Sequence, residues 1–214
     1  ENITEKLAAF ATSTEYSSFP LAVKKQAAIC LLDWLGAALA GSLQISTQII
    51  SSLFENTGPN EATIIGGKSK TSSVNAALIN GVAGHAVEFD DINEEAVIHP
   101  AAAVIPAALS IAERVGANGK QLLRAIVVGY DVAIRIAKAV MPTHYKFWHT
   151  TGTCGTFGAA AAAGNLLELS SRGMVRAFGI AGTLAAGLID AFGTMCKPLN
   201  AGKAAMNGVL AALL

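Results

Sequence analysis

Carboxylates and histidines gather in one short stretch of this chain. Residues 84–91 read GHAVEFDD, and the pair His99-Pro100 follows. This density stands out because only 14% of all residues are charged. A carboxylate beside a histidine fixes the tautomer of the imidazole ring and raises its pKa, which suits a general acid or base. Asp90, Asp91 and His99 are therefore candidate catalytic residues.

Two other interpretations of this stretch stay open. In one, it is a solvated loop whose acids cap a helix that begins at Pro100. In the other, it holds a divalent metal ion, although its spacing matches neither an HExxH helix nor a recognised carboxylate array. In either case, Glu88 and Asp91 would lie on one helical face if the preceding helix continued through the stretch. The possible metal ligands are His85, Asp90, Asp91 and His99.

A second polar stretch precedes an alanine-rich segment. Residues 144–156 read HYKFWHTTGTCGT. Thr151 or Thr153 is expected to cap the following helix, whose N-terminal amides and dipole favour an anion such as a carboxylate. The competing interpretation is that His149 and the threonines only satisfy the helix terminus, while the aromatic rings join the core. Cys154 is expected to be a small buried residue, because no activating partner is evident.

A third stretch places two lysines around a predicted helix start. Residues 196–205 read CKPLNAGKAA. Asn200 is expected to cap this helix, and Lys197 and Lys203 would then suit a carboxylate ligand. The alternative is an exposed helix entry with solvated lysines. Neither GxxxxGK[ST] nor a GxGxxG after a strand occurs, so no nucleotide is expected here.

Helical signals run through the chain and must position these three stretches. Asn2 with Glu5 resembles a capping box, and Asn118 is a candidate cap further along. Gly81 and Gly84 lie on one face of a predicted helix, where they indicate close helix contact. The predicted helices cover residues 2–11, 20–40, 46–55, 71–87, 101–115, 120–140, 153–167, 171–187 and 201 onward, and residues 62–65 form the only plausible strand.

Composition limits the class of protein. Of the 214 residues, 52% are hydrophobic, which predicts one domain with a large core. Lys and Arg number 15, as do Asp and Glu, without a basic cluster, so we expect neither a nucleic-acid partner nor a polybasic membrane patch. The three cysteines show no CxxC spacing, so neither a disulfide framework nor a structural zinc site is expected, and a cytoplasmic location is the default.

Neither a signal peptide nor a membrane-spanning segment is expected. The amphipathic N-terminus carries Glu5 and Lys6. The most apolar stretch, residues 27–40, is interrupted by Asp33 and Gly36 and is shorter than the roughly 20 residues that a bilayer crossing needs. The last apolar helix carries no stop signal. We therefore expect a piece of a longer protein, whose apolar surface binds a further domain or a second copy.

The three stretches together resemble the MmgE/PrpD family. The matching blocks are GHAVEFDD with His99-Pro100, then HTTGTCGTFGAAAAAG, then KPLNAGKAAMNG, and residues 23–42 resemble the family's first long helix. That family includes 2-methylcitrate dehydratase, cis-aconitate decarboxylase and iminodisuccinate epimerase, which all act on small polycarboxylates. The resemblance implies an all-α, multi-helix domain spanning residues 1–214, a homodimer, and neither a metal nor an organic cofactor. The family's smaller α+β domain is expected to be absent from this chain.

The resemblance also assigns pocket positions. The acids of the family's first block fall on Glu88, Asp90 and Asp91, and its histidine falls on His99. His149 matches the histidine before the threonine-rich loop, and the lysine of the KPL block falls on Lys197. Ile92 and Asn93 stand where threonine often follows the paired aspartates, and the match is closer to the decarboxylase and epimerase members than to the dehydratase.

Chemistry and resemblance together predict a cofactor-independent lyase or isomerase acting on a small polycarboxylate. Removing a proton next to a carboxylate needs a base and groups that stabilise the developing enediolate. His99 or His149, oriented by Asp90 or Asp91, is expected to move the proton, with Tyr145 as a second-rank candidate. Two alternatives remain: a non-catalytic helical module that binds polycarboxylates, and a metal-dependent hydrolase. The predicted substrate-binding residues are Glu88, Thr150, Thr151, Thr153, Lys197 and Lys203.

Overall fold

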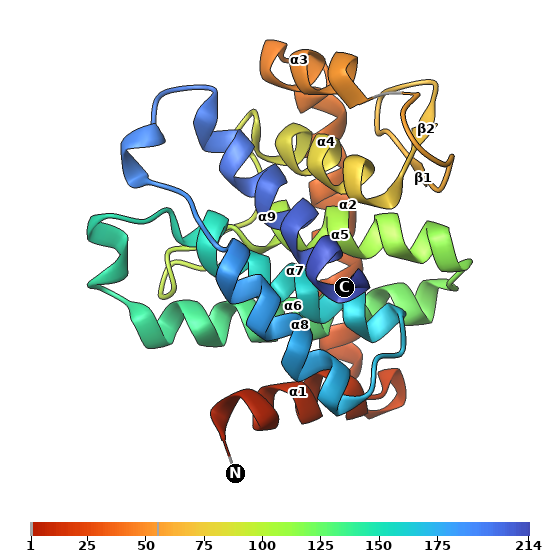
Figure 1. The fold of residues 1–214 in the computed structure, drawn as a ribbon, viewed down its shortest axis with the longest axis vertical. Helices are drawn as coiled ribbons and strands as arrows, with labels where there is room; N and C mark the ends of the chain where they lie inside the picture. The colour runs from red at the N-terminus through yellow and green to blue at the C-terminus, as the bar shows by residue number, and fades with distance from the viewer. Residues whose placement is uncertain (1, 55) are drawn as a thin grey trace.

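The chain folds into a helical bundle, as the fold-class prediction requires. The computed structural model describes residues 2–54 and 56–214. Within these residues nine α-helices follow one another (Figure 1). Their bounds are α1 Ile3–Ser13, α2 Leu21–Gly41, α3 Ile45–Phe54, α4 Ser73–His85, α5 Pro100–Val115, α6 Gly119–Val140, α7 Thr150–Leu166, α8 Ser171–Leu184 and α9 Cys196–Leu213.

The remaining regular structure is small. Strands β1 (Ala62–Thr63) and β2 (Lys70–Thr71) pair antiparallel, with Ala62 opposite Thr71. The sequence indicated β1 but missed its partner, because two residues are too few to show an alternating pattern. In the part of the chain that the structure describes, three short 3-10 helices lie between the α-helices, namely η1 Tyr16–Ser18, η2 His144–Lys146 and η3 Ile189–Ala191.

Small residues let the central helices α4, α5, α7 and α9 approach closely. A Cβ atom on Gly81 would lie 2.7 Å from the Cα of Gly202, and one on Gly84 would lie 2.2 Å from Nε1 of Trp34. The predicted close contact at these two glycines is therefore confirmed. Gly208 of α9 is equally tight, since its Cβ would lie 2.3 Å from that of Ala159 in α7. Such packing buries the thin alanine surface that dominates the core.

Several helix ends follow the sequence signals, and others do not. Asn2 and Asn118 both form the capping boxes that the sequence indicates, with Glu5 and Gln121 respectively. Helix α4 was expected to reach residue 87, but it ends at His85, since Glu88 adopts a left-handed φ of 51°. Glu88 and Asp91 therefore do not share a helical face.

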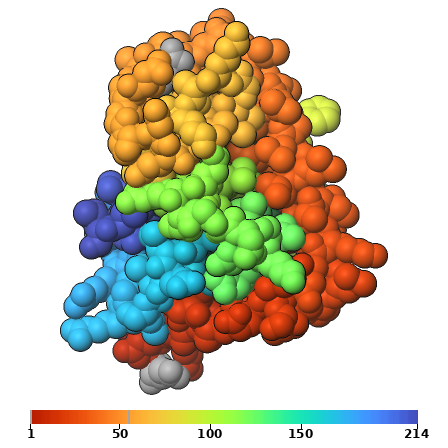
Figure 2. Space-filling model, turned by 90° about the vertical axis from the view of Figure 1, so that its right-hand side faces the viewer, coloured from red at the N-terminus to blue at the C-terminus, as the bar shows by residue number. Residues whose placement is uncertain are grey.

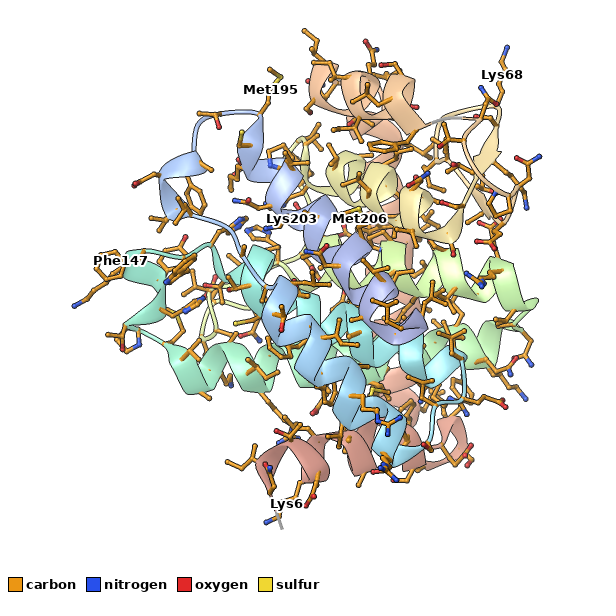
Figure 3. All side chains as sticks on the ribbon, in the orientation of Figure 1. Lys6, Lys68, Phe147, Met195, Lys203 and Met206 are labelled. Atoms are coloured by element: carbon orange, nitrogen blue, oxygen red, sulfur yellow. The ribbon has the colours of Figure 1, made fainter. Side chains whose placement is uncertain are left out.

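The N-termini of α7 and α9 lie on the same side of the bundle. The segments that lead into them, residues 141–149 and 185–195, form the left edge of Figure 1. An isolated bridge joins Trp148 to Leu188, and the backbone N–H of His149 donates to the carbonyl of Gly187. Phe147 and Met195 point outward from this edge, whereas Lys203 lies within the body of the protein (Figure 3). Two polar helix starts are thus brought together.

Another face of the protein is unusually apolar. Helices α2 and α3 form a strip along one side of the surface in Figure 2. Within the described ranges no single helix has both the length and the apolar composition of a membrane-spanning segment, and α2 and α3 meet these criteria only as a pair bent by 88°. The exposed apolar side chains of the strip include Ile29, Leu32, Leu39, Leu43, Ile45, Ile49 and Leu53.

Candidate active site

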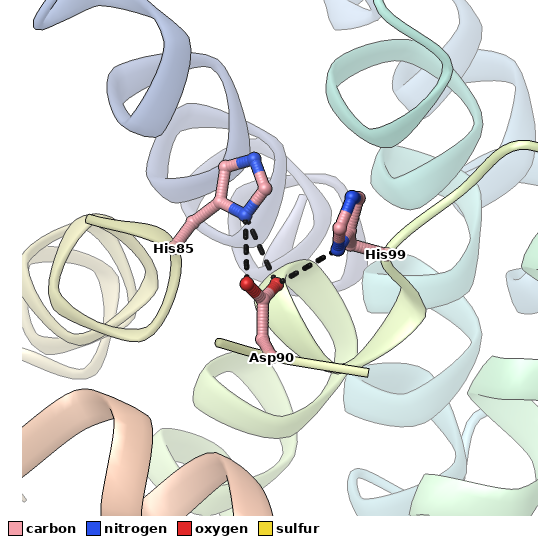
Figure 4. A group of neighbouring side chains, drawn as sticks. All are labelled: His85, Asp90 and His99. Atoms are coloured by element: carbon pink, nitrogen blue, oxygen red, sulfur yellow. Dashed lines mark hydrogen bonds and ion pairs between the residues drawn. The ribbon is translucent and has the colours of Figure 1, made fainter. Parts of the chain in front are cut away.

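A buried carboxylate lies between two imidazole rings at the end of α4 (Figure 4). Oδ2 of Asp90 is 3.0 Å from Nδ1 of His85 and 3.5 Å from Nδ1 of His99. The side chains of His85 and Asp90 are fully buried, while that of His99 is 19% exposed. The solvated-loop interpretation is therefore wrong for Asp90.

Backbone conformation shapes the segment that brings these residues together. Glu88 has a φ of 51° and Val97 a φ of 46°, in the left-handed region that non-glycine residues seldom adopt. Between them, the backbone of Asn93 pairs with that of Ile98 in an isolated bridge. The chain thus folds back on itself, and His99 returns to the end of α4.

Asp91 faces away from the histidines. Its Oδ2 accepts a 2.8 Å hydrogen bond from the hydroxyl of Tyr130, and its Oδ1 accepts a 3.1 Å bond from the backbone N–H of Ala101. Burial raises the pKa of the Asp91 carboxyl to about 6, although both hydrogen bonds act in the opposite direction. Asp91 therefore caps α5, as the capping interpretation proposed for this stretch.

A third imidazole completes the cluster. The His149 ring stacks on His85, with centroids 5.6 Å apart and planes at 22°, and meets the edge of Phe192 at 4.9 Å. His85 and His99 also touch, with centroids 4.9 Å apart. Burial, reinforced by the neighbouring cationic groups, lowers the pKa of His149 to about 3. Burial also lowers the pKa of His99, against the raising effect of Asp90.

The threonines of the second stretch lie inside the first turns of α7. The residue at the N-cap is His149, without a side-chain cap bond, so the expected cap at Thr151 or Thr153 is wrong. Thr151 Oγ1 instead accepts a 3.1 Å bond from the backbone N–H of His99. Thr153 Oγ1 lies 2.7 Å from Nε2 of His144. Thr150 Oγ1 is buried without a partner in the described part of the chain.

Lys197 and Lys203 enter the same region from α9. Nζ of Lys197 lies 2.5 Å from Oε2 of Glu88 and 4.8 Å from the centroid of the Phe192 ring. Lys203 donates a 2.7 Å bond to the carbonyl of Ala186, and burial lowers its pKa. Helix α9 begins at Cys196, five residues earlier than expected, so Asn200 lies within the helix and does not cap it. The alternative of an exposed helix entry with solvated lysines is wrong, since only 8% of Lys197 is exposed.

Tyr145 lies at the edge of this region. Its ring centroid is 6.3 Å from that of Phe192. Burial and the nearby Glu88 carboxylate raise the pKa of the Tyr145 hydroxyl. A hydroxyl that keeps its proton can donate a hydrogen bond to a ligand and is a poor base.

The sequence did not identify two residues of the cluster as pocket residues. His85 was considered only as a metal ligand, and Phe192 was not singled out. The signal for His85 was available, because a histidine five residues before an aspartate at a helix end can turn back to meet it. The signal for Phe192 was not, because the loop that carries it shows no pattern.

Unpaired polar atoms mark the place where a ligand would bind. Buried side-chain nitrogens and oxygens normally have hydrogen-bond partners. Of six such atoms that lack one among the described residues, five lie in or beside the cluster. A polar ligand would satisfy these atoms. They are His85 Nε2, His99 Nδ1, His149 Nδ1, Thr150 Oγ1 and Asn200 Nδ2.

The same region includes a possible set of metal ligands. His85, Asp90 and His99 can each offer one ligand atom, and these atoms lie within 4.8 Å of one another. Asp91, which the metal hypothesis also included, is engaged by Tyr130 and α5 and does not belong to this group.

Comparison with known proteins identifies the fold. The model of the MmgE/PrpD N-terminal domain matches residues 5–214. Cis-aconitate decarboxylase of Aspergillus terreus is 31% identical over 221 residues, covering 99% of this chain and 45% of that protein. Human cis-aconitate decarboxylase is 34% identical over 193 residues, covering 86% of this chain and 40% of that protein. The mouse enzyme is 28% identical over 223 residues, covering all of this chain and 45% of that protein.

These relatives are longer than the chain. The chain spans less than half of each of them. The match nevertheless includes all three polar stretches, because it extends from residue 5 to residue 214. The chain belongs to the MmgE/PrpD family and corresponds to the N-terminal domain of that family.

Proposed function

We propose that this chain is the part of a cofactor-independent lyase that binds a small polycarboxylate and transfers a proton next to one of its carboxylates. The observation that carries the proposal is the Asp90–His99 pair. Because Nδ1 of His99 faces the buried carboxylate, Nε2 is the ring nitrogen that remains for proton exchange. Asp90 would stabilise the imidazolium that forms when Nε2 takes up a proton.

Carboxylate binding is assigned to the starts of α7 and α9. Lys197 is a nearly buried cation whose described ion-pair partner, Glu88, has a side chain that is 58% exposed. A substrate carboxylate could take the place of this exposed partner beside Lys197. Thr150, with its unpaired hydroxyl, and the N–H groups of the first turn of α7 supply further donors. His149 would serve as a neutral hydrogen-bonding group, because its pKa is about 3.

Decarboxylation of a compound such as cis-aconitate is the reaction that we favour, because cis-aconitate decarboxylases are among the relatives. The bond between the carboxylate carbon and the adjacent carbon breaks, and its electron pair stays on the adjacent carbon. Carbon dioxide leaves, and the carbanion takes the proton from Nε2 of His99. Solvent then returns a proton to the ring. Epimerisation would use the same base and the same carboxylate-binding groups.

Deuterium incorporation tests this proposal. The chain is incubated in heavy water with cis-aconitate, citrate or aspartate, and the C–H signals are followed by proton NMR. We expect deuterium in the decarboxylated product of cis-aconitate. His99→Ala should lower the rate by about 10²–10⁴-fold, which is the usual contribution of a general acid or base. His149→Ala should also remove turnover, and Lys146→Met, at an exposed lysine of η2, should leave it unchanged.

A second function would be indicated by binding without turnover. The unpaired buried polar atoms of the cluster would also suit a module that binds polycarboxylates without reacting. Saturable shifts of the imidazole NMR signals upon addition of cis-aconitate, with no deuterium incorporation, would establish that alternative. Absence of both shifts and incorporation would contradict both functions.

We also propose that the protein acts as a homodimer. The support is the apolar strip along α2 and α3, where Leu32, Leu39 and Leu43 are each more than half exposed. A protein of this composition is expected to cover such a surface. Sedimentation at several concentrations tests this, with Leu32→Glu as the disrupting variant. A monomer at every concentration would contradict it.

A further inference from the structure

We propose that His85, Asp90 and His99 form an inhibitory binding site for a divalent transition-metal ion, with Zn²⁺ as the best match. The ion would sit between the two Nδ1 atoms and the Asp90 carboxylate (Figure 4). Binding of the ion rests only on these three side chains. Its inhibitory effect rests on the proposed function, in which His99 exchanges a proton.

The distances suit a tetrahedral ion. With Zn–N and Zn–O bonds of about 2.0–2.2 Å, neighbouring ligand atoms of a tetrahedral site lie roughly 3.3–3.6 Å apart. Oδ2 of Asp90 lies 3.0 Å from Nδ1 of His85 and 3.5 Å from Nδ1 of His99, so the first distance is slightly shorter than this range and the second lies within it. The three ligand atoms lie within 4.8 Å of one another, so a modest rotation of His99 completes the geometry. Its side chain is 19% exposed, whereas those of His85 and Asp90 are fully buried.

The ligand chemistry also suits zinc. Imidazole nitrogen is a good ligand for Zn²⁺, Cu²⁺ and Ni²⁺, and carboxylate oxygen completes many zinc sites. Nδ1 of His99 is buried, lies 3.5 Å from Oδ2 of Asp90 and makes no hydrogen bond among the described residues, so an ion could bind it in place of that ion pair. The contacts of Asp90 in the described part of the chain are with the two imidazoles. A bound cation would compensate this buried negative charge directly.

Three protein ligands leave one coordination position open. Zinc sites with three protein ligands usually hold water or an anion at the fourth position. Lys197 and the start of α7 already make this region suitable for anions, so a substrate carboxylate could occupy that position without being turned over. The chain has two further histidines. His149 stacks on His85, and His144 lies outside the cluster and bonds to Thr153.

Metal binding would stop proton transfer through the tautomer of His99. A neutral imidazole that binds a metal through Nδ1 carries its proton on Nε2. Nε2 would then have no lone pair to accept a proton, and donating its own proton would leave a metal-bound imidazolate in place of a neutral ring. Asp90 would be engaged by the ion and could no longer stabilise an imidazolium. The metal-free state would be active, and the metal-bound state would be inactive.

Cobalt titration tests the binding site without any need for activity. The metal-free protein is prepared with a chelator that is then removed, and Co²⁺ is added while the visible d–d bands of tetrahedral cobalt are recorded. We expect one equivalent to bind and Zn²⁺ to displace it. His99→Ala, which alters a partly exposed side chain, and Asp90→Asn should each weaken binding more than tenfold. Circular dichroism establishes that both variants are folded.

Matched controls separate this site from chance ligands. His144→Ala removes the histidine outside the cluster, and Cys196→Ser removes an exposed thiol that could bind Co²⁺. Both variants should bind like the original protein. Absence of tetrahedral bands with one equivalent of Co²⁺, or bands unchanged in His99→Ala, would overturn the proposal.

The inhibitory effect has its own readout. Zn²⁺ should suppress deuterium incorporation from heavy water, and EDTA should restore it. Half-inhibition at a Zn²⁺ concentration more than tenfold away from the Zn²⁺ affinity measured by displacement of Co²⁺ would overturn the inhibitory role. If the chain has no turnover, the proposed function fails, and the cobalt titration still decides whether the ion binds.

Discussion

Two polar regions of this protein differ in how completely their polar groups are paired. Beside the hairpin that strands β1 and β2 form, the Glu113 carboxylate accepts hydrogen bonds from the backbone N–H and hydroxyl of Thr63 and from Lys70. Glu61 accepts two bonds from Ser73 and lies 3.5 Å from Arg114. In the histidine cluster, by contrast, several buried atoms lack partners.

This difference separates structural polar groups from functional ones. A paired network stabilises the fold, and although burial acts in the raising direction, the hydrogen bonds and the neighbouring cations lower the pKa of Glu61 and Glu113. A buried atom without a partner costs stability, so its persistence needs another reason. A ligand that pairs with the histidine cluster supplies that reason.

The largest expected effect is a loss of turnover when the cation beside the histidine cluster is removed. Lys197→Met keeps much of the apolar stem and removes the cation. Turnover should fall by about 10²–10³-fold, as when one group that stabilises developing negative charge is removed. Stability should change little, because Glu88 is more than half exposed and can be solvated. Steady-state rates measure turnover, and urea unfolding measures stability. A large loss of stability would mean that Lys197 stabilises the fold, as the groups beside the hairpin do.

A second test uses the pH dependence of stability. His149 has an ordinary pKa of 6.5 in the unfolded chain and about 3 in the fold, so protonation favours the unfolded state. Stability should fall as the pH drops below 6.5, by about 2 kcal/mol at pH 5 for this group alone. Urea unfolding between pH 7 and pH 5, with EDTA present, measures the loss.

The matched variant for this test is His149→Gln, which cannot titrate. It should remove most of the loss, whereas His144→Gln, on the partly buried neighbour, should retain most of it. An equal pH dependence in all three proteins would show that the cluster does not penalise charge as its burial implies.

Asp91 provides a boundary case, because it lies next to Asp90 but is paired like the hairpin glutamates. Tyr130→Phe leaves Oδ2 of Asp91 without its 2.8 Å donor. Unfolding free energy should drop by about 1–2 kcal/mol, because a buried acceptor is left unpaired. Turnover should change no more than a few-fold. A rate loss as large as that of His99→Ala would move Asp91 into the catalytic group.

The sequence predicts the helices and the three polar stretches well, for identifiable physical reasons. Helix periodicity and capping residues such as Asn2 and Asn118 are local signals. The partners of Asp90 and Asp91 are not local. Asp91 binds Tyr130, 39 residues away, and the His99 backbone binds Thr151, 52 residues away. Which aspartate faces the histidines therefore depends on the turn at Glu88, which no pattern indicates.

The smallest effect is expected at the hairpin. Glu113→Gln keeps one acceptor oxygen and removes the charge that draws Lys70 and Thr63 together. The unfolding free energy at pH 7 should fall by about 1 kcal/mol, since these bonds are charge-assisted but partly exposed.

The pH dependence of that loss identifies its cause. The pKa of Glu113 is lower in the fold than its ordinary value of 4.5, so its contribution is present above pH 4.5 and is lost as the pH falls through the lowered value. The difference between variant and original protein should therefore shrink towards pH 3, while turnover at pH 7 stays unchanged. A difference that persists at pH 3 would mean that side-chain packing, and not the ionised carboxylate, stabilises this region, and the contrast with the histidine cluster would then be one of shape and not of charge.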